Sequence, residues 1–274
     1  MLAGPLPPHS RWRPGSGWRS TTMNSLARLR SVGLIAVLLG IWQVACAHQK
    51  VQLLPSPLAV ARGIGELAQH GLLVKYVVAS LFRVTWGFLG AAILAVPFGL
   101  ALGWYKRPGM ALNPLIQILR PISPLAWIPI SILWFGVGDM SAIFLIFLAS
   151  FLPLTVTAMN AVANVLPVHI HAARNFGLRQ DQLLCRVLLP AVAPQLIVGL
   201  RITLGIAWLV VVAAEMIAVN SGLGFLIVDS RNAGNRYDLV VAGMVLIGAI
   251  GLLLDIGMRS FERVRSVRWG YSED

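Results

Sequence analysis

The sequence predicts an all-α, polytopic membrane protein with about six transmembrane helices. Of its 274 residues, 57% are hydrophobic and only 12% are charged, whereas about 25% of the residues in soluble domains are charged. The mean hydropathy is +0.78. A chain of this composition has too little polar surface to cover a water-facing globule, so its apolar exterior must meet lipid.

The first 48 residues combine a basic tail with an apolar run. Residues 1–30 carry five arginines and no acidic residue, and their prolines and glycines break any regular pattern, so we expect a disordered tail. Met23 is an alternative start that would remove most of this tail. The apolar run at 31–48 predicts the first transmembrane helix, although Ala45-Cys-Ala47 also fits the cleavage site of a signal peptide.

The next part of the chain predicts a surface helix followed by a long span. Residues 49–73 mix polar and apolar positions, and Ser56 is a candidate N-cap for a short amphipathic helix at the outer membrane surface. The apolar stretch 74–105 is long enough to cross a bilayer with tilt, and it ends before the basic residues 106–107. Its Gly99-Leu-Ala-Leu-Gly103 pattern suits close packing of helices.

Prolines interrupt the third and fourth spans. Four prolines between residues 111 and 135 remove backbone donors, so this stretch predicts a kinked span whose apolar part is 122–135. A short turn at 136–139 precedes the fourth span at 143–163, which contains Pro153.

A long polar interruption at 164–190 separates these spans from the last two. The fifth and sixth spans are predicted at 193–218 and 239–258, and a polar loop at 220–236 joins them. Residues 261–274 are expected to form a C-terminal tail.

The basic residues orient the spans. Six spans place both termini on one side, and 14 of the 22 Lys and Arg residues lie there, in 1–30, at 106–107, in 164–190 and after Met258. Because basic loops remain in the cytoplasm, both termini and the loop 164–190 are predicted to be cytoplasmic. The net charge of +12 therefore orients the protein in a membrane, and the absence of a basic run interleaved with aromatics argues against a nucleic-acid partner.

Neither a disulfide framework nor a metal site is predicted. The two cysteines, Cys46 and Cys185, have no pairing pattern and no metal-ligand spacing. No phosphate-binding G-x-x-x-x-G-K-[ST] loop occurs in the sequence either. We therefore expect no cofactor and no catalytic residues in this chain.

The cytoplasmic loop contains the most specific pattern in the sequence. It reads His171-Ala172-Ala173, three residues, Gly177, nine residues, and Val187-Leu-Leu189-Pro190. The two alanines favour a helix and let another surface approach closely. Gly177 permits a sharp turn with positive φ, and apolar residues at 183, 184, 187 and 188 predict a second short helix that ends at Pro190.

This loop resembles the coupling loop of ABC-transporter permeases, whose pattern is E-A-A, three residues, G, nine residues, I-x-L-P. Five residues match that pattern at the right spacing: Ala172, Ala173, Gly177, Leu189 and Pro190. His171 stands where the family often has Glu, and Val187 stands conservatively for Ile. The resemblance covers nearly all of residues 53–268, and the stretches 120–129, 133–136 and 214–224 are similar to permeases for nitrate, sulfonate and taurine.

The resemblance implies a type I ABC importer permease in the inner membrane of a bacterium, with its transmembrane domain at 74–260. In this family two permease subunits form the pore, a dimer of cytoplasmic ATPase subunits docks on the Gly-containing loops, and a periplasmic binding protein delivers the substrate. For this chain it implies a homodimer that imports a small anion such as taurine, an aliphatic sulfonate or nitrate. Permeases for thiamine-precursor pyrimidines are also similar and remain an alternative.

Ionisable residues within the spans are candidates for the translocation path, because charge at membrane depth is costly. Glu215, near the outer end of the fifth span, is a candidate gate or a contact for the binding protein, and pairing with an Arg is the alternative. Arg201 suits the attraction of an anion, but we favour snorkelling or pairing with Asp255. Arg83 is expected to pack within its span or to reach the membrane surface.

Two other classes of protein fit the sequence less well. An ion-driven secondary carrier predicts paired intramembrane acids and an inverted repeat, whereas Glu215 and Asp255 stand without a clear repeat. A membrane-embedded enzyme predicts His, Asp or Ser clustered at one depth, whereas His169 and His171 lie in a loop.

Overall fold

The computed structural model describes residues 33–34, 37–38, 40–46 and 55–262. Within them every regular element is helical and no strand occurs, which confirms the all-α class. The tail at 1–30, residues 263–274 and part of the predicted span at 31–48 lie outside the described residues.

The chain divides into two compact units, Met1–Pro57 and Leu58–Asp274. In the first unit the described residues at 33–34, 37–38 and 40–46 are helical. That this helix crosses a membrane stays a prediction. The features described below belong to the second unit.

Four helices within the described residues are long and apolar enough to cross a membrane. They are α3 (Leu72–Trp104), α6 (Asp139–Ala163), the run Gln180–Ala218 that contains α9 (Leu189–Ala218), and α11 (Tyr237–Glu262). A fifth span is present if α4 (Lys106–Leu119) and α5 (Ile128–Phe135) are counted together.

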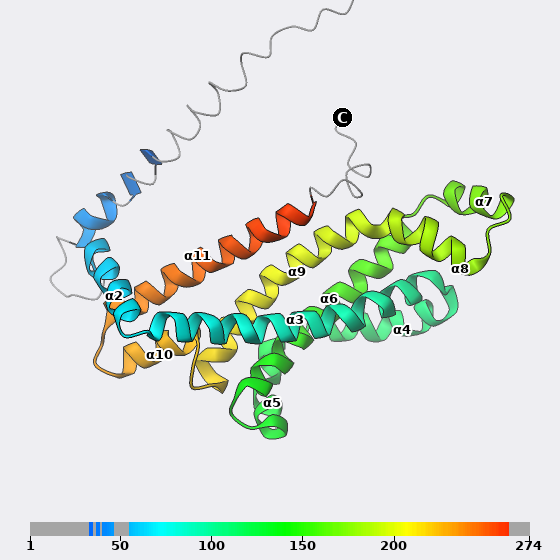
Figure 1. Cartoon of the computed structure of the whole chain (residues 1–274). Coiled ribbons are helices and arrows are strands. Elements are labelled where there is room, and N and C mark those ends of the chain that lie inside the picture. The colour runs from blue at the N-terminus through cyan, green and yellow to red at the C-terminus, as the bar shows by residue number, and fades with distance from the viewer. Residues whose placement is uncertain (1–32, 35–36, 39, 47–54, 263–274) are drawn as a thin grey trace, which may run out of the picture. The chain divides into compact units, whose positions relative to one another are not determined.

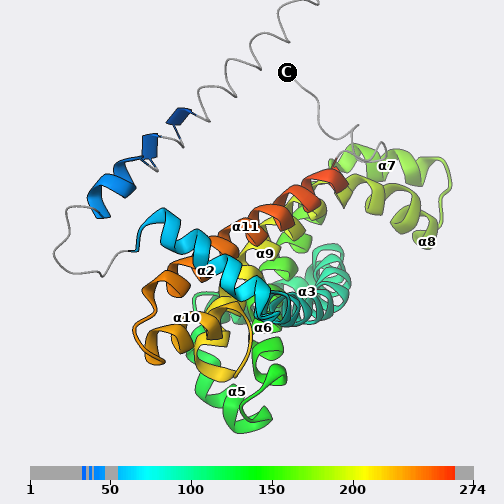
Figure 2. The same ribbon diagram turned by 60° about the vertical axis from the view of Figure 1, so that its left-hand side comes forward.

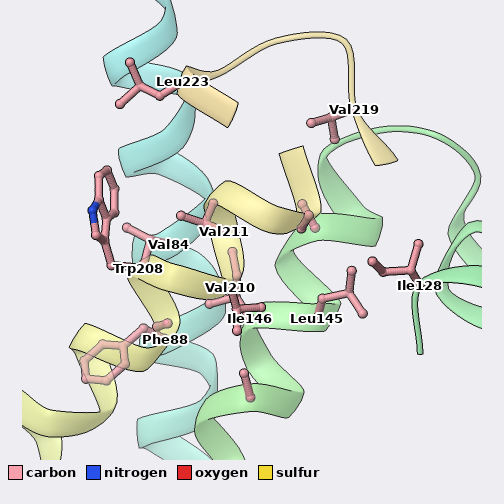
Figure 3. Close-up of a cluster of buried hydrophobic side chains, with 14 of the residues drawn as sticks. Val84, Phe88, Ile128, Leu145, Ile146, Trp208, Val210, Val211, Val219 and Leu223 are labelled. Atoms are coloured by element: carbon pink, nitrogen blue, oxygen red, sulfur yellow. The ribbon is translucent and has the colours of Figure 1, made fainter. Parts of the chain in front are cut away.

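The core of the second unit lies where α3, α6 and α9 pack together. α3 packs along α6, and α6 packs along α9, while α11 lies against α9 (Figure 1). Buried apolar side chains from these helices form one cluster, part of which is drawn in Figure 3: Val84, Phe88, Leu145, Ile146, Trp208, Val210 and Val211. The indole Nε1 of Trp208 also donates a hydrogen bond of 3.0 Å to the carbonyl of Ile247, which ties α9 to α11.

Glycines allow α3 and α6 to approach closely. A Cβ at Gly103 would lie 2.8 Å from the Cβ of Val162, and a Cβ at Gly99 would collide with the carbonyl of Thr155. Both contacts fall on α6, so the Gly99–Gly103 spacing packs α3 against α6 as small residues do in membrane helices.

The predicted third span is broken more sharply than a kink. α4 and the segment formed by η1 (Pro124–Trp127) and α5 meet at 82°. α4 begins at Lys106, so residues 106–107 start a helix where the sequence predicted its span to end. The eight residues of α5 are too few to cross a bilayer by themselves.

Short helices occupy the two ends of the second unit (Figures 1 and 2). α2 (Pro57–Gln69) and α10 (Leu223–Asn232) lie at one end, here called the α10 end. α7 (Pro167–Asn175) and α8 (Gln180–Leu183) lie at the opposite end, here called the α7 end. The loop predicted at 220–236 was wrong, because it contains α10, which forms around the buried side chains of Leu223, Leu226 and Ile227.

Candidate functional site

The α7 end is built around a sharp turn at Gly177. α7 begins at Pro167, whose missing N–H costs nothing in a first helical turn. The backbone of Gly177 has φ +76°, a left-handed conformation that favours glycine. The N–H of Leu178 donates to the carbonyl of Ala173 at 3.2 Å, and the N–H of Gly177 donates to that of Arg174 at 2.9 Å. These two bonds form a Schellman motif, which ends α7 and reverses the chain toward α8.

α7 presents a mostly exposed surface. The side chain of Phe176, at the turn, is 85% exposed, and Val168 is 62% exposed. His171 and Ala172 are also exposed, whereas Ala173 is buried beneath them. The structure therefore places the first part of the matched pattern on a surface that another protein can reach.

The second part of the pattern lies on a continuous helix. η2 (Leu184–Leu188), a wider π-type turn, joins α8 to α9, and the helical run continues from Gln180 to Ala218. The prediction that the second short helix ends at Pro190 was therefore wrong. Pro190 lies in the first turn of α9, where a missing backbone donor is tolerated.

Side chains of this helix support the turn. Leu183 and Leu188 are buried, Val187 is half-buried, and Leu189 and Pro190 are exposed. A cavity of about 560 Å³ separates α7 from the start of α9, and its walls include Ala173, Phe176 and Val187. The pattern thus brings an exposed face and its supporting residues to one end of the molecule.

Arg201 forms a partly exposed ion pair between α9 and α11. Its Nε lies 2.6 Å from Oδ1 of Asp255, and Nε of Arg259 lies 2.9 Å from Oδ2 of the same carboxylate. The side chain of Arg201 is 26% exposed. The favoured pairing of Arg201 with Asp255 is therefore present, and it links α9 to α11.

Glu215 lies near the α10 end and is fully buried. Its Oε1 accepts a hydrogen bond of 2.7 Å from Arg83, and its Oε2 accepts bonds of 2.9 Å from both the Ser80 hydroxyl and the N–H of Gly224. The Ser80 hydroxyl in turn accepts a 3.0 Å bond from the N–H of Leu223. The carboxylate therefore fastens the start of α10 to α3 and α9, and its burial rules out direct contact with a binding protein in this conformation.

The side chain of Arg83 is the centre of this network. It is 2% exposed and donates four hydrogen bonds, and its Nη2 atom also forms an ion pair with Asp139. Besides Glu215, its partners are the carbonyl and hydroxyl of Ser221 and the carboxylate of Asp139, at the start of α6. The expectation that Arg83 packs or snorkels missed this role.

Glycine makes the network possible where the chain turns into α10. Gly222 has φ +104°, and a Cβ there would collide with the Glu215 carboxylate. A Cβ at Gly224 would collide with the carbonyl of Val212. We refer to Ser80, Arg83, Asp139, Glu215, Ser221 and the N–H groups of residues 223 and 224 as the arginine network.

A sequence pattern could have pointed to the arginine network. Arg83 and Glu215 are opposite charges in separate spans, and a charge at membrane depth requires a partner. Ser80 and Ser221 carry no such sequence feature. Among the described residues no group of three or more His, Cys, Asp or Glu side chains is placed to hold a metal ion.

Comparisons with known proteins give a consistent result. Residues 95–266 match a family described as binding-protein-dependent transport system inner membrane component. The chain is 37% identical to the taurine transport system permease protein TauC of Escherichia coli (strain K12), over 85% of this chain and 87% of that protein. It is 34% identical to a putative aliphatic sulfonates transport permease protein, SsuC, of Bacillus subtilis (strain 168), over 88% and 87% of the two chains.

A further relative and a solved structure extend this result. The chain is 35% identical to the nitrate import permease protein NrtB of Synechocystis sp. (strain ATCC 27184 / PCC 6803 / Kazusa), over 83% of this chain and 85% of that one. An inward-facing structure of the MetNI methionine ABC transporter superposes with a TM-score of 0.62 at 21% identity, covering 75% of this chain and 99% of the matched chain.

Proposed function

The chain belongs to the family of binding-protein-dependent transport system inner membrane components, and from this premise we propose that it imports a small oxyanion. It is a transport subunit, and ATP hydrolysis takes place on a separate chain. The relatives named for taurine, aliphatic sulfonates and nitrate support the substrate class, because sulfonate and nitrate both present several oxygens around one centre.

The observation that carries the proposal is the exposed face of α7, closed by its turn at Gly177. On a chain without a nucleotide-binding loop, a rigid exposed helix of this kind suits docking of an ATPase subunit. Phe176, which is 85% exposed, is the natural anchor for a pocket on that partner. We assign coupling to these residues: His171, Ala172, Ala173, Gly177, Val187, Leu189 and Pro190.

The charge distribution supports an orientation. We place the α7 end in the cytoplasm, because the sequence assigns the loop 164–190 to the face that carries 14 of the 22 basic residues. The α10 end then faces outward, where a periplasmic binding protein would deliver the substrate.

The break between α4 and α5 supports a second copy of the chain as partner. Non-helical backbone at membrane depth is tolerated where protein covers it or where it lines water. The segment around the break exposes large apolar side chains, including Leu133 at 81% and Trp134 at 60%. A second copy packed here would cover this surface and place the break beside a shared translocation path.

The two charges predicted for the path take different roles in this proposal. Arg201 is partly exposed and lines the path. Glu215 is fully buried, so it acts on the path by positioning Arg83.

The proposal is tested by reconstituting the chain in proteoliposomes with an ATPase subunit and a binding protein of the same transport system. We expect ATP-dependent uptake of taurine, methanesulfonate or nitrate, and no ATP hydrolysis by the permease alone. Uptake of a thiamine-precursor pyrimidine in their place would overturn the substrate class.

A variant of the exposed aromatic residue tests the coupling surface. Phe176→Asp should reduce co-purification of the ATPase about tenfold, because it removes a central apolar anchor. Phe176→Leu is the matched control and should retain most of the association. Full association of the Phe176→Asp variant would contradict docking at α7.

A further inference from the structure

A cavity opens beside the arginine network at the α10 end. Its volume is about 420 Å³, and its walls include Lys75, Val78, Ala79, Arg83, Asp139 and Ser221. Val78 and Lys75 are exposed on α3, and Asp139 is 56% exposed. Since an exposed carboxylate facing lipid is costly, this face of the protein must meet water.

The guanidinium of Arg83 has two edges with different partners. Its Nη1 atom donates to Glu215 Oε1 and to the carbonyl of Ser221, both at 2.7 Å. Its Nε and Nη2 atoms face Asp139, at 2.8 Å and 2.7 Å, and Nη2 also donates to the hydroxyl of Ser221. The first edge is held by a buried carboxylate, whereas the second is held by an exposed one.

Asp139 contacts the second edge of the guanidinium through only one of its two carboxylate oxygens. Both the Nε and the Nη2 contacts go to a single oxygen, Oδ1. A guanidinium edge is a fork that matches two oxygens of one anion, so a single-oxygen contact leaves this fit incomplete. The carboxylate also follows Gly136 and Gly138, around which no atom would contact an added Cβ. Asp139 can therefore leave Arg83 without disturbing packed side chains.

We propose that this cavity is an outer anion site, in which a sulfonate or nitrate group replaces the Asp139 carboxylate on the Nε and Nη2 atoms of Arg83. The proposal rests on the proposed function and names the residues that first receive the substrate. Glu215 keeps the other edge of Arg83 throughout.

Charge balance favours such an exchange. Removing the partner of a buried arginine is strongly unfavourable. When one anion replaces another, Arg83 stays paired on both edges at every stage. Lys75 lies on the cavity wall and adds a second positive charge, which raises the local concentration of anions. Without substrate, the Asp139 carboxylate thus occupies the position of the substrate anion on Arg83. It leaves this position when the anion binds.

Cysteine labelling tests the site directly. Val78→Cys, in a Cys46→Ala/Cys185→Ala background, places a thiol on the cavity wall of the reconstituted complex. We expect sulfonatoethyl methanethiosulfonate to label it faster than the trimethylammonium reagent does. Taurine, methanesulfonate or nitrate should slow this labelling. Leu58→Cys on α2, which is exposed and lies outside the cavity walls, is the control and should show no protection.

Three further variants make the test specific. Asp139→Asn removes the competing carboxylate and should lower the half-protecting anion concentration about threefold to fivefold, the scale of one exposed ion pair. Lys75→Gln should raise that concentration, and Lys75→Arg should restore it.

The outcomes separate this site from the proposed function. If the complex takes up one of these anions and that anion protects neither Val78→Cys nor its Asp139→Asn form, the outer anion site is overturned and the permease function stands. Equal protection by chloride would also overturn it, because chloride offers one acceptor atom and not the two oxygens that match the guanidinium fork. If uptake of all three anions is absent, the substrate class itself falls.

Discussion

The two ends of the second unit are held in different ways. At the α10 end, residues from α3, α6, α9 and the turn into α10 meet in the arginine network, and its central side chains are 2% and 0% exposed. At the α7 end, the turn at Gly177 is made by backbone bonds between neighbouring residues, and its largest side chain is 85% exposed.

This difference separates a fixed region from a contact region. Buried charges that share hydrogen bonds over long sequence separations hold their segments in one arrangement, because any displacement leaves a charge unpaired. The turn that closes α7 is held by local backbone bonds, and no buried charge is described there. We therefore expect the α7 end to accommodate small displacements against a partner while the α10 end keeps its internal geometry.

The largest expected effect is on transport, at the α7 end. Gly177→Asp should lower substrate uptake about tenfold or more, because it places a charge at the left-handed turn where we propose that the ATPase docks. The protein should remain in the membrane fraction, since a non-glycine residue at this φ costs only about 1–2 kcal/mol. Uptake assays and immunoblots of membranes measure the two quantities.

Gly177→Asn is the matched control for charge. Asn tolerates a left-handed conformation and has the size of Asp, so this variant should keep much of the uptake. Wild-type uptake by Gly177→Asp would remove the coupling role from the α7 end.

The next effect is on stability, at the α10 end. Glu215→Ala leaves Arg83 buried without its main counter-charge, and we expect a loss of about 3–5 kcal/mol in the free energy of unfolding. Glu215→Gln keeps an acceptor for Gly224 and should lose less. Thermal unfolding of the purified protein in detergent measures both, and a melting temperature unchanged in Glu215→Ala would show that this end is not fixed by the network.

A smaller effect is expected in the packed middle, between the two ends. Gly99→Val should destabilise the protein by about 1–3 kcal/mol, because the new side chain collides with Thr155 and Ala158 of α6. At Gly90 an added Cβ would meet one ring atom of Phe147 at 3.8 Å, so Gly90→Val should change stability by about 0.5 kcal/mol or less. Equal losses in the two variants would argue against the close approach of α3 and α6.

The smallest effect concerns an exposed ion pair at the α10 end. Nη2 of Arg236 lies 2.7 Å from Oε2 of Glu66, and this hydrogen bond lowers the pKa of the Glu66 carboxyl below its ordinary value of 4.5. A lowered pKa in the folded protein means that the stabilisation is present above the unfolded pKa and is lost as the pH falls through the folded value.

Melting curves against pH measure this pair. The melting temperature of the wild type should slightly exceed that of Glu66→Gln above about pH 5, and the difference should vanish in more acidic solution. A difference that persists at low pH would show that Glu66 acts through contacts other than its charge.

The membrane helices were largely predictable from the sequence, because each is specified by its own residues. Apolar runs placed α3, α6, α9 and α11, with the α9 end at Ala218 as expected. α10 was not predictable in this way, because its polar residues suggest a loop and its burial depends on packing against α9 and α11. The prediction that a helix ends at Pro190 failed for a related reason. A proline ends a helix in its interior but is tolerated in its first turn, which is where Pro190 lies.

The candidate sites also differ in whether neighbouring residues or the whole fold specify them. The pattern around Gly177 depends on neighbouring residues, so the turn and its positive φ followed from the sequence. The arginine network joins residues up to 143 positions apart, and no local pattern pairs Arg83 with Ser221. Glu215 was identified as important from its charge alone, whereas Ser80 and Asp139 gained their roles only from the fold.

The unbroken helical run from Gln180 to Ala218 has a mechanical consequence. At 1.5 Å per residue its 39 residues correspond to about 58 Å of helix, which bends where η2 joins α8 to α9 (Figure 1). It begins next to the face that we propose for docking, and Glu215 lies three residues before its end at Ala218. The proposed docking face and the carboxylate that holds Arg83 are therefore joined by one continuous helical segment of the backbone.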